Sequence, residues 1–338
     1  MHFVKMVPVA LLLFFSGSVT SDDVPSLSPT QFEQLFESVK NWGRWGNEDQ
    51  LGTVNFISEK QVKESAQLVT LGVRVSLANN LNKVKDINNR NFLSLPWPKL
   101  AGPFAQETFS FPTENSDVHG ALDRFEIFHH GFAHSHLDGL AHFSWKGKIY
   151  NGYPLEIIDE ELTELGIEQM GQKGIVSRGV LVDFPRLKKV EYLEPGQLIT
   201  LDDFKLWEEE TGIVLQEGDV LLVRTGRWKA VDALEEWQFS TLSAGLHPNL
   251  VSLFHKRKIA VVGCDGVSDR NPSIAEGIPD PFHILSLVAM GMPLLDNLNL
   301  EELSEVAQQT GRHTFMFTGA PLRAKGASGS PLNPIAVF

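Results

Sequence analysis

Five of the eleven histidines fall within residues 129–142, and this clustering is the main chemical signal of the sequence. If the segment is extended, every second side chain points to the same face, because strand side chains alternate. That face would carry His130, His134, His136 and Asp138. Imidazole nitrogens with a carboxylate oxygen suit Zn²⁺ or Mn²⁺, whereas calcium prefers more oxygen ligands. The segment therefore predicts a site for a divalent metal ion.

Two other interpretations of the segment compete with a metal site. A buried histidine is usually a hydrogen-bonded member of the core, and a histidine-rich stretch can be a surface tract. Both fit less well, because apolar residues that we expect to be buried lie between the histidines. These residues are Phe132, Leu137, Leu140 and Phe143.

Short apolar runs further along the chain predict the elements that position this segment. Residues 179–183, 219–224 and 259–263 are rich in β-branched residues and too short for helices, so they predict buried strands. Helix-like stretches, residues 201–211 and 246–256, lie between them. Strands and helices that alternate in this way predict an α/β fold with a mixed sheet.

Two helices are predicted ahead of these elements. Apolar residues recur at helical spacing after Ser28, and Ser58 with Gln61 forms a capping-box pattern for a second helix that Gly72 would close. No repeat, low-complexity linker or break in composition interrupts residues 22–338. We therefore expect one domain over that range.

Composition excludes several classes of protein and of site. Hydrophobic residues make up 42% of the 338 residues, as in an ordinary folded globule. The formal charge of -13 repels phosphate backbones and anionic lipid surfaces, so we expect neither nucleic acid nor membrane as a partner. Cys264 is the single cysteine, which excludes an intramolecular disulfide and any zinc site built on several thiolates. A metal must therefore use histidines and carboxylates.

The first 21 residues have the pattern of a secretory signal peptide. A charged start is followed by an apolar run over residues 7–15 and by small residues before Asp22. The run is about half of the roughly 20 residues that a membrane-spanning helix needs, which disfavours a membrane anchor. We expect secretion, with the mature chain starting at Asp22, and cleavage after Ser18 is the alternative.

Four stretches of the sequence match the pattern of one family. Residues 135–142 fit the T-H-x-D-x-x-x-H core of the signature H-x-G-T-H-x-D-x-P-x-H, and residues 45–55 fit the opening W-G-x-x-D-x-L-G-T-x-N. Residues 218–226 and 326–334 also resemble their counterparts. On these stretches the sequence resembles the cyclase family, which includes bacterial kynurenine formamidase and isatin hydrolase, over nearly the whole mature chain. The resemblance implies a swivelling β/α/β fold that forms homodimers or homotetramers.

The resemblance also implies roles for individual residues. His136 and Asp138 fall on metal ligands, and the aspartate can bridge two ions where two are bound. His283 and Asp296 would complete the metal site, and His142 falls on the catalytic histidine. The implied reaction is hydrolysis of a small-molecule amide, lactam or lactone by metal-activated water. His142 would take the proton of the water, with second-shell support of the metal as its alternative role.

Two departures from the family pattern leave the number of metals open. Phe132, which cannot bind a metal, occupies the place of the first histidine of the signature, so either His130 or His134 would substitute, or one metal would bind. Asp296 stands in place of the usual glutamate, and its spacing from His283 is one residue longer than in the short bacterial members.

Other functions remain compatible with the same residues. A cyclase or dehydratase of secondary metabolism would use the same ion with a different acceptor, and a secreted metal-binding protein could keep the fold without turnover. The sequence contains no H-E-x-x-H, no G-x-S-x-G, no P-loop and no G-x-G-x-x-G after a strand.

Overall fold

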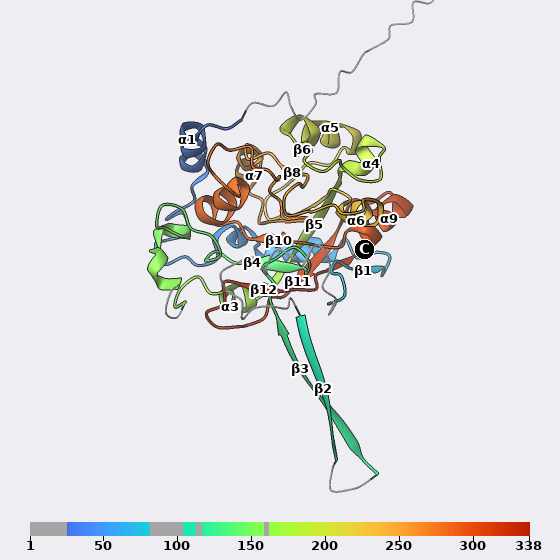
Figure 1. Cartoon of the computed structure of the whole chain (residues 1–338). Coiled ribbons are helices and arrows are strands. Elements are labelled where there is room, and N and C mark those ends of the chain that lie inside the picture. The colour runs from blue at the N-terminus through green and yellow to red at the C-terminus, as the bar shows by residue number, and fades with distance from the viewer. Residues whose placement is uncertain (1–25, 82–103, 113–116, 159–161) are drawn as a thin grey trace, which may run out of the picture.

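The computed structural model of the protein describes residues 26–81, 104–112, 117–158 and 162–338 (Figure 1). The predicted signal peptide, residues 1–21, lies outside these described residues and stays a prediction. Within the described ranges, none of the helices combines the length and the apolar character that crossing a bilayer requires.

One mixed sheet runs through the molecule (Figure 1). Among the described residues it has nine strands: β1 Arg74–Ser76, β4 His136–Asp138, β5 Ile175–Asp183, β7 Val220–Arg224, β9 Val261–Cys264, β10 Leu294–Asp296, β11 Thr314–Gly319, β12 Gly329–Pro331 and β13 Ile335–Val337. Their order is β1-β13-β11-β5-β7-β9-β10-β4-β12, with β5, β7, β9 and β10 parallel and the other pairs antiparallel. The predicted single-domain α/β fold with a mixed sheet is confirmed.

Helices cover the sheet, and Figure 1 shows several of them on one side of it. The helices are α1 Pro29–Val39, α2 Glu59–Ala66, α3 Glu168–Gly171, α4 Phe184–Lys188, α5 Leu201–Thr211, α6 Arg227–Ala233, α7 Leu250–Arg257, α8 Pro281–His283 and α9 Glu301–Thr310, with the 3₁₀ turns η2 Gly52–Phe56, η5 Tyr150–Gly152 and η6 Leu155–Ile158 and the π-helix η7 Ile284–Met290. Buried side chains of α1, α4, α5 and α7 form one core with the sheet.

The central parallel strands are buried on both faces, as their continuous apolar runs predict. Val180 and Val223 point into the core under α1, α5 and α7. Leu181 and Leu222, their neighbours along the same strands, point into a second core that also contains Leu137 of β4. Packing on both faces therefore fixes β5 and β7 in the middle of the sheet, three and two strands away from the β10–β4 pair that carries the site.

Two of the predicted helices are shorter than the sequence suggests. The capping box of Ser58 and Gln61 is present, but α2 ends at Ala66 instead of continuing to Gly72, whose N–H donates to the carbonyl of Phe338. The helix expected over residues 246–256 begins at Leu250. Residues 245–246 instead form the short strand β8 (Gly245–Leu246), which pairs with β6 (Leu198–Ile199). In both places, pairing with a distant segment replaces the local helical preference.

A separate hairpin projects from the body of the molecule (Figure 1). Its strands, β2 (Phe104–Pro112) and β3 (His119–Ile127), pair with each other in antiparallel register. The described side chains of β3 are mostly exposed, and Leu122 is 59% exposed. We call residues 104–127 the arm.

The sheet brings the two ends of the site together across more than 150 residues of sequence. Strand β4 lies between β10 and β12 and is antiparallel to both. In this register His136 is directly opposite Asp296, and Asp138 is opposite Gly329. Directly opposed residues on neighbouring strands point to the same face. The pairing thus places an imidazole of β4 beside a carboxylate of β10.

Candidate metal centre and active site

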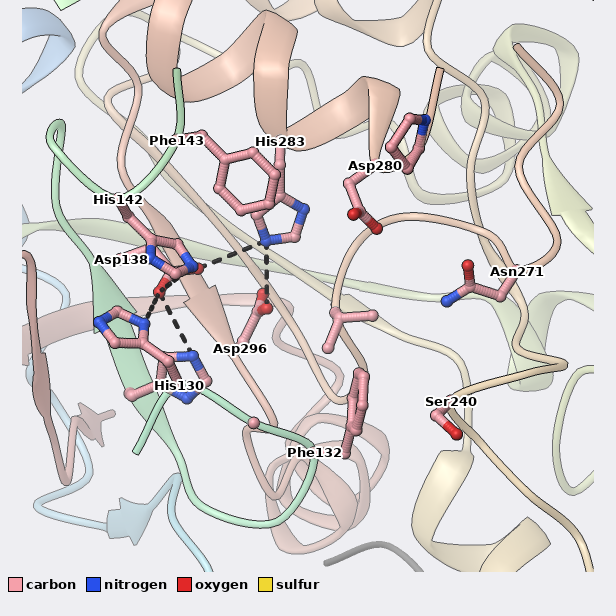
Figure 2. Close-up of a pocket in the computed structure, with 14 residues that line it drawn as sticks. His130, Phe132, Asp138, His142, Phe143, Ser240, Asn271, Asp280, His283 and Asp296 are labelled. Carbon is pink, nitrogen blue, oxygen red and sulfur yellow. Dashed lines mark hydrogen bonds and ion pairs between the residues drawn. The ribbon is translucent and has the colours of Figure 1, made fainter. Parts of the chain in front are cut away.

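A cavity with a volume of ≈ 380 Å³ opens beside the ends of β4 and β10 (Figure 2). It is lined by His130, Gly131, Phe132, His136, Asp138, His142, Phe143, Ser240, Val267, Asn271, Pro279, Asp280, His283 and Asp296. Six of the seven candidate site residues from the sequence are in this set, and His134 is not.

Strand β4 presents His136 and Asp138 to the cavity while Leu137 between them points into the core. The Nδ1–H of His136 donates to the carbonyl of His134 over 2.8 Å, because a carbonyl only accepts. The free nitrogen, Nε2, therefore faces the cavity and lies 3.3 Å from Oδ1 of Asp138. This backbone contact fixes the tautomer that a metal ligand needs.

His283 is held in the same way by a carboxylate. Asp269 accepts from Nδ1 of His283 over 2.6 Å and from the backbone N–H groups of Phe282 and His283 over 2.7 and 3.0 Å. Nε2 of His283 then points at the β4–β10 pair, 3.4 Å from Oδ2 of Asp138 and 3.4 Å from Oδ2 of Asp296. A carboxylate behind a ligating imidazole orients the ring and raises its basicity.

The two carboxylates of the site are almost fully buried. Asp138 is 1% exposed and Asp296 is 2% exposed. Among the described residues, no hydrogen-bond donor serves Oδ2 of Asp138 or Oδ1 of Asp296. Two buried carboxylates with unsatisfied oxygens are costly, and a cation between them removes that cost.

The separations between these atoms fit a metal ion better than they fit hydrogen bonds. At 3.3 to 3.4 Å, the contacts among His136, Asp138, His283 and Asp296 are longer than a good N–H···O bond. Ligand atoms of His136, Asp138 and Asp296 all lie within 4.8 Å of one another, so these three residues form a group that could hold a divalent ion. His283 approaches both carboxylates of this group and could join it.

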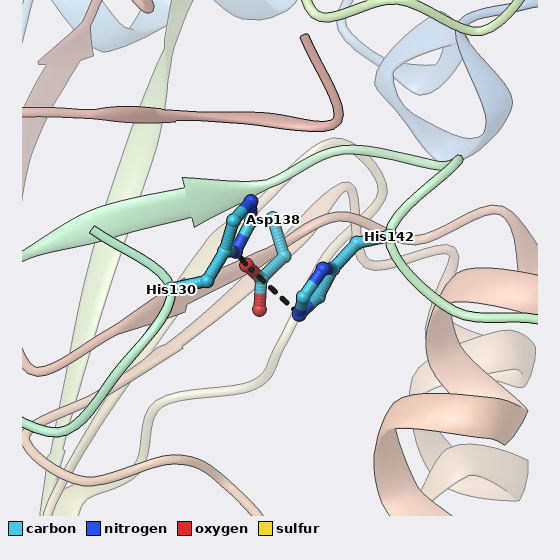
Figure 3. A group of neighbouring side chains, drawn as sticks. All are labelled: His130, Asp138 and His142. Carbon is cyan, nitrogen blue, oxygen red and sulfur yellow. Dashed lines mark hydrogen bonds and ion pairs between the residues drawn. The ribbon is translucent and has the colours of Figure 1, made fainter. Parts of the chain in front are cut away.

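His142 and His130 also approach Asp138 (Figure 3). Their rings stack with centroids 3.9 Å apart, and Nδ1 of His130 lies 2.8 Å from Oδ1 of Asp138. Nε2 of His142 is 3.6 Å from the same oxygen, beyond hydrogen-bond range. The three residues form a second group that could hold a metal ion, with Asp138 common to both groups.

His142 has the protonation state that a general base requires. Burial lowers its pKa to about 3, which outweighs the opposing effect of Asp138. Its imidazole is therefore neutral near pH 7, and a pKa this far below neutral makes it a weak base in the metal-free site.

The other groups of the site are electrostatically coupled. Burial alone would lower the pKa values of His136 and His283, but the neighbouring carboxylates raise both. Burial would raise the pKa of Asp138, yet the surrounding histidines hold it well below its usual range. For Asp296, burial prevails over His283 and raises the pKa. A cation entering the site must therefore displace protons.

The histidine-rich loop before β4 is not the continuous strand that would place every second residue on one face. Residues 130–134 form bends, and the alternation holds for His136 and Asp138 only. Of the two histidines considered as substitutes for the ligand missing at Phe132, the structure places His130 at the cavity. His134 is buried and contributes its carbonyl, which accepts from Nδ1 of His136.

Two residues that the sequence analysis did not single out hold this loop in place. Nδ2 of Asn297 donates to the carbonyls of Gly131 and His134 over 2.6 and 3.2 Å. The guanidinium of Arg227 donates to the carbonyl of Phe132 and to Oδ1 of Asn297, and lies 3.6 Å from the ring centroid of Phe239. The loop that carries His130 is therefore tied to the segments that follow β7 and β10.

Asp269 is the other supporting residue that the sequence analysis missed. It lies shortly after the predicted strand at residues 259–263. Functional side chains collect at the carboxyl ends of parallel strands, so this position could have identified Asp269 as a candidate site residue. Ser328, whose Oγ lies 3.2 Å from Nε2 of His130, belongs to the glycine-rich stretch near the C-terminus. Gly329 permits this approach, because a Cβ there would lie 2.5 Å from Cε1 of His130.

Comparisons with known proteins agree with the geometry. The structure is similar to a crystal structure described as a novel cyclase, with a TM-score of 0.77, 27% identity, and coverage of 89% of this chain and 100% of that one. Isatin hydrolase A from Ralstonia solanacearum has a TM-score of 0.56 at 21% identity over 79% of this chain and 92% of its own. Isatin hydrolase A from Labrenzia aggregata, bound to benzyl benzoate, has a TM-score of 0.56 at 21% identity, covering 82% and 97%. The likeness to these two hydrolases shows a shared fold.

No curated protein matches the sequence. The family model described as Cyclase matches residues 92–269, which is more than half of the chain. The chain therefore belongs to the cyclase family.

Proposed function

We propose that the protein is a metal-dependent hydrolase of a small-molecule amide, lactam or lactone, resembling kynurenine formamidase in its chemistry. The observation that carries the proposal is the set of buried side chains His136, Asp138, His283 and Asp296 next to a neutral histidine, in a cavity the size of a small-molecule site. Membership of the cyclase family and the fold shared with isatin hydrolases support it.

The donor set favours Zn²⁺ or Mn²⁺ as the cofactor. Two imidazoles, from His136 and His283, and two carboxylates, from Asp138 and Asp296, match the ligands that these ions take. A bound divalent ion supplies polarisation of a carbonyl and a lower pKa for water. The second group, built on His130 and His142, shares Asp138, so we keep one ion per chain as the minimum.

His142 is the residue that we propose to move the proton. It accepts a proton from the attacking water as the water oxygen bonds to the substrate carbonyl carbon. It then donates that proton to the leaving nitrogen or oxygen as the C–N or C–O bond breaks, so atoms and charge balance. Its neighbour Phe143 and the opposite Phe132 form apolar walls that suit an aromatic or alkyl portion of the substrate.

The experiment combines metal analysis with a substrate panel. Purified protein is tested for bound metal and for hydrolysis of N-formylkynurenine, isatin and lactones, before and after chelation. We expect activity that chelation removes and metal restores. His142→Ala should abolish turnover with the metal retained, while His119→Ala, at an exposed position of the arm, serves as the control.

The alternatives give different results in the same experiment. Bound metal without hydrolysis of any member of the panel would favour a metal-binding protein that lacks turnover. Ring closure or loss of water from a panel compound would favour a cyclase or dehydratase.

We also propose that the protein enters the secretory pathway and assembles as a homodimer or homotetramer. Residues 1–21 support the first proposal, and N-terminal sequencing of the exported protein should give Asp22. The exposed arm supports the second, because a two-stranded hairpin is marginally stable alone. Light scattering on the wild type and on Leu122→Glu tests this assembly, and a monomeric wild type would contradict it.

A further inference from the structure

The cavity has a second polar end beyond His283. Asp280, which is three residues before His283 and interacts electrostatically with it, lines this end together with Asn271, and Figure 2 shows both side chains directed into the same open space. Among the described residues, no hydrogen bond or ion pair holds the Asp280 carboxylate. The Asn271 backbone pairs with Ser243, and its side-chain amide has no hydrogen-bond partner in the described part of the chain.

The local backbone explains why the Asp280 carboxylate faces the cavity. Asp280 precedes the first residue of α8, where an aspartate normally accepts from the N–H groups of the first helical turn. Here those N–H groups, from Phe282 and His283, donate to Asp269 instead. Asp280 makes no capping bond, so its carboxylate stays available to a molecule in the cavity.

The same backbone holds Asp280 in one orientation. Its φ of 46° and ψ of 50° are left-handed, a conformation that aspartate and asparagine tolerate better than most residues. Pro279 and Pro281 flank it, and each proline ring fixes its own φ. The backbone of Asp280 is therefore fixed at the cavity wall, and its side chain is left open to a ligand group.

The charges of the cavity select the kind of group that this end can bind. Among the described residues that line it, there is no lysine or arginine to pair with Asp280. A ligand carboxylate at this end would meet a like charge, whereas an ammonium or N–H group would gain a charge-assisted hydrogen bond. Val267 and Phe132 also line the cavity and suit an apolar centre of the ligand.

We propose that Asp280 and Asn271 form a specificity subsite for substrates that carry an amine or ammonium group on an apolar or aromatic body, opposite the bond that is cleaved. This inference rests on the proposed function, because it assigns the scissile carbonyl to the end with His136 and His283. Asp280 binds the amine directly, and Asn271 donates to or accepts from the same part of the substrate.

Binding of small probes tests the subsite without any turnover. Isothermal titration measures the affinities of benzylamine, benzyl alcohol and benzoate for the full-length protein. Asp280 should favour benzylamine and disfavour benzoate, so we expect the ratio of their affinities to fall in Asp280→Asn. Asp280→Asn should weaken benzylamine about tenfold and leave benzyl alcohol unchanged, because asparagine keeps the left-handed backbone and removes the charge. Asn271→Asp should strengthen benzylamine, and Glu276→Gln, exposed on a neighbouring loop, should change nothing.

The results separate failure of the subsite from failure of the proposed function. Equal benzylamine affinity in the wild type and Asp280→Asn would overturn the subsite, as would a wild type that binds benzylamine no better than benzyl alcohol. If benzylamine binding depends on Asp280 but no amide or lactone is hydrolysed, the subsite stands and the hydrolase proposal fails. If hydrolysis occurs with no preference for amine-bearing substrates, the subsite fails and the hydrolase proposal stands.

Discussion

The two ends of the cavity are built in opposite ways. At one end, Nε2 of His136 lies 3.3 Å from Asp138, and Nε2 of His283 lies 3.4 Å from both Asp138 and Asp296. Supporting carbonyl and carboxylate groups fix both imidazoles from behind. At the other end, the Asp280 carboxylate has neither an ion-pair partner nor a hydrogen-bond donor among the described residues. The difference indicates that one end is preorganised for an ion and the other is left open for a ligand group.

Removing one proposed metal ligand should have the largest effect of any single substitution, because it disables the metal-binding end of the cavity. We expect His136→Ala to lose metal affinity by more than the roughly 10- to 100-fold typical of outer-shell changes, and to lose all metal-dependent activity. Metal analysis of the purified variant and an activity assay measure both effects. Retention of full metal content would show that His136 is not a ligand.

His142→Ala should affect catalysis and spare the metal. Loss of a general base lowers kcat by about 10²- to 10⁴-fold, and the four proposed ligands are untouched. Steady-state kinetics with parallel metal analysis separates the two effects. If the metal is lost together with activity, His142 is a ligand of the second group instead.

Asp269→Asn should weaken metal binding only through His283, the imidazole that Asp269 orients. Asparagine cannot provide the same negative partner for Nδ1, so we expect about 10- to 100-fold weaker metal binding. Competition with a chelator of known affinity measures the change. Asp202→Asn, at an exposed position on α5, is the matched control. An unchanged affinity in Asp269→Asn would contradict the orienting role.

Metal binding should strengthen as pH rises. His136 and His283 have raised pKa values in the metal-free fold, so their protonated forms stabilise that fold below about pH 6.5, and this contribution is lost as pH rises through the raised values. Each proton that an ion must displace contributes about tenfold in affinity per pH unit. Thermal melts with and without Zn²⁺ should show a gain in Tm that is larger at pH 8 than at pH 6. A constant gain would contradict the proton displacement.

The parts of the fold that the sequence predicted are those with local signals. Continuous apolar runs identified β5, β7 and β9. Helical spacing after Ser28 identified the start of α1, and a capping box identified the start of α2. The end of α2 and the start of α7 depend on pairing with Phe338 and with β6, which no local pattern reveals.

The same distinction applies to the site. His136 and Asp138 could be grouped from their alternation on one strand, whereas His283 and Asp296 came from family resemblance and meet β4 only through the sheet. The supporting role of Asp269 requires knowing which N–H groups it captures. These contacts between distant segments are set by tertiary packing, and for that reason the sequence did not provide them.

The most direct test of the account is a crystal structure of the metal-loaded protein, with anomalous diffraction recorded at the absorption edge of the metal. We predict a peak about 2.0–2.2 Å from Nε2 of His136, Nε2 of His283 and carboxylate oxygens of Asp138 and Asp296. Metal-loaded, active protein with no peak among these four residues, or with its single peak between His130 and His142, would contradict it.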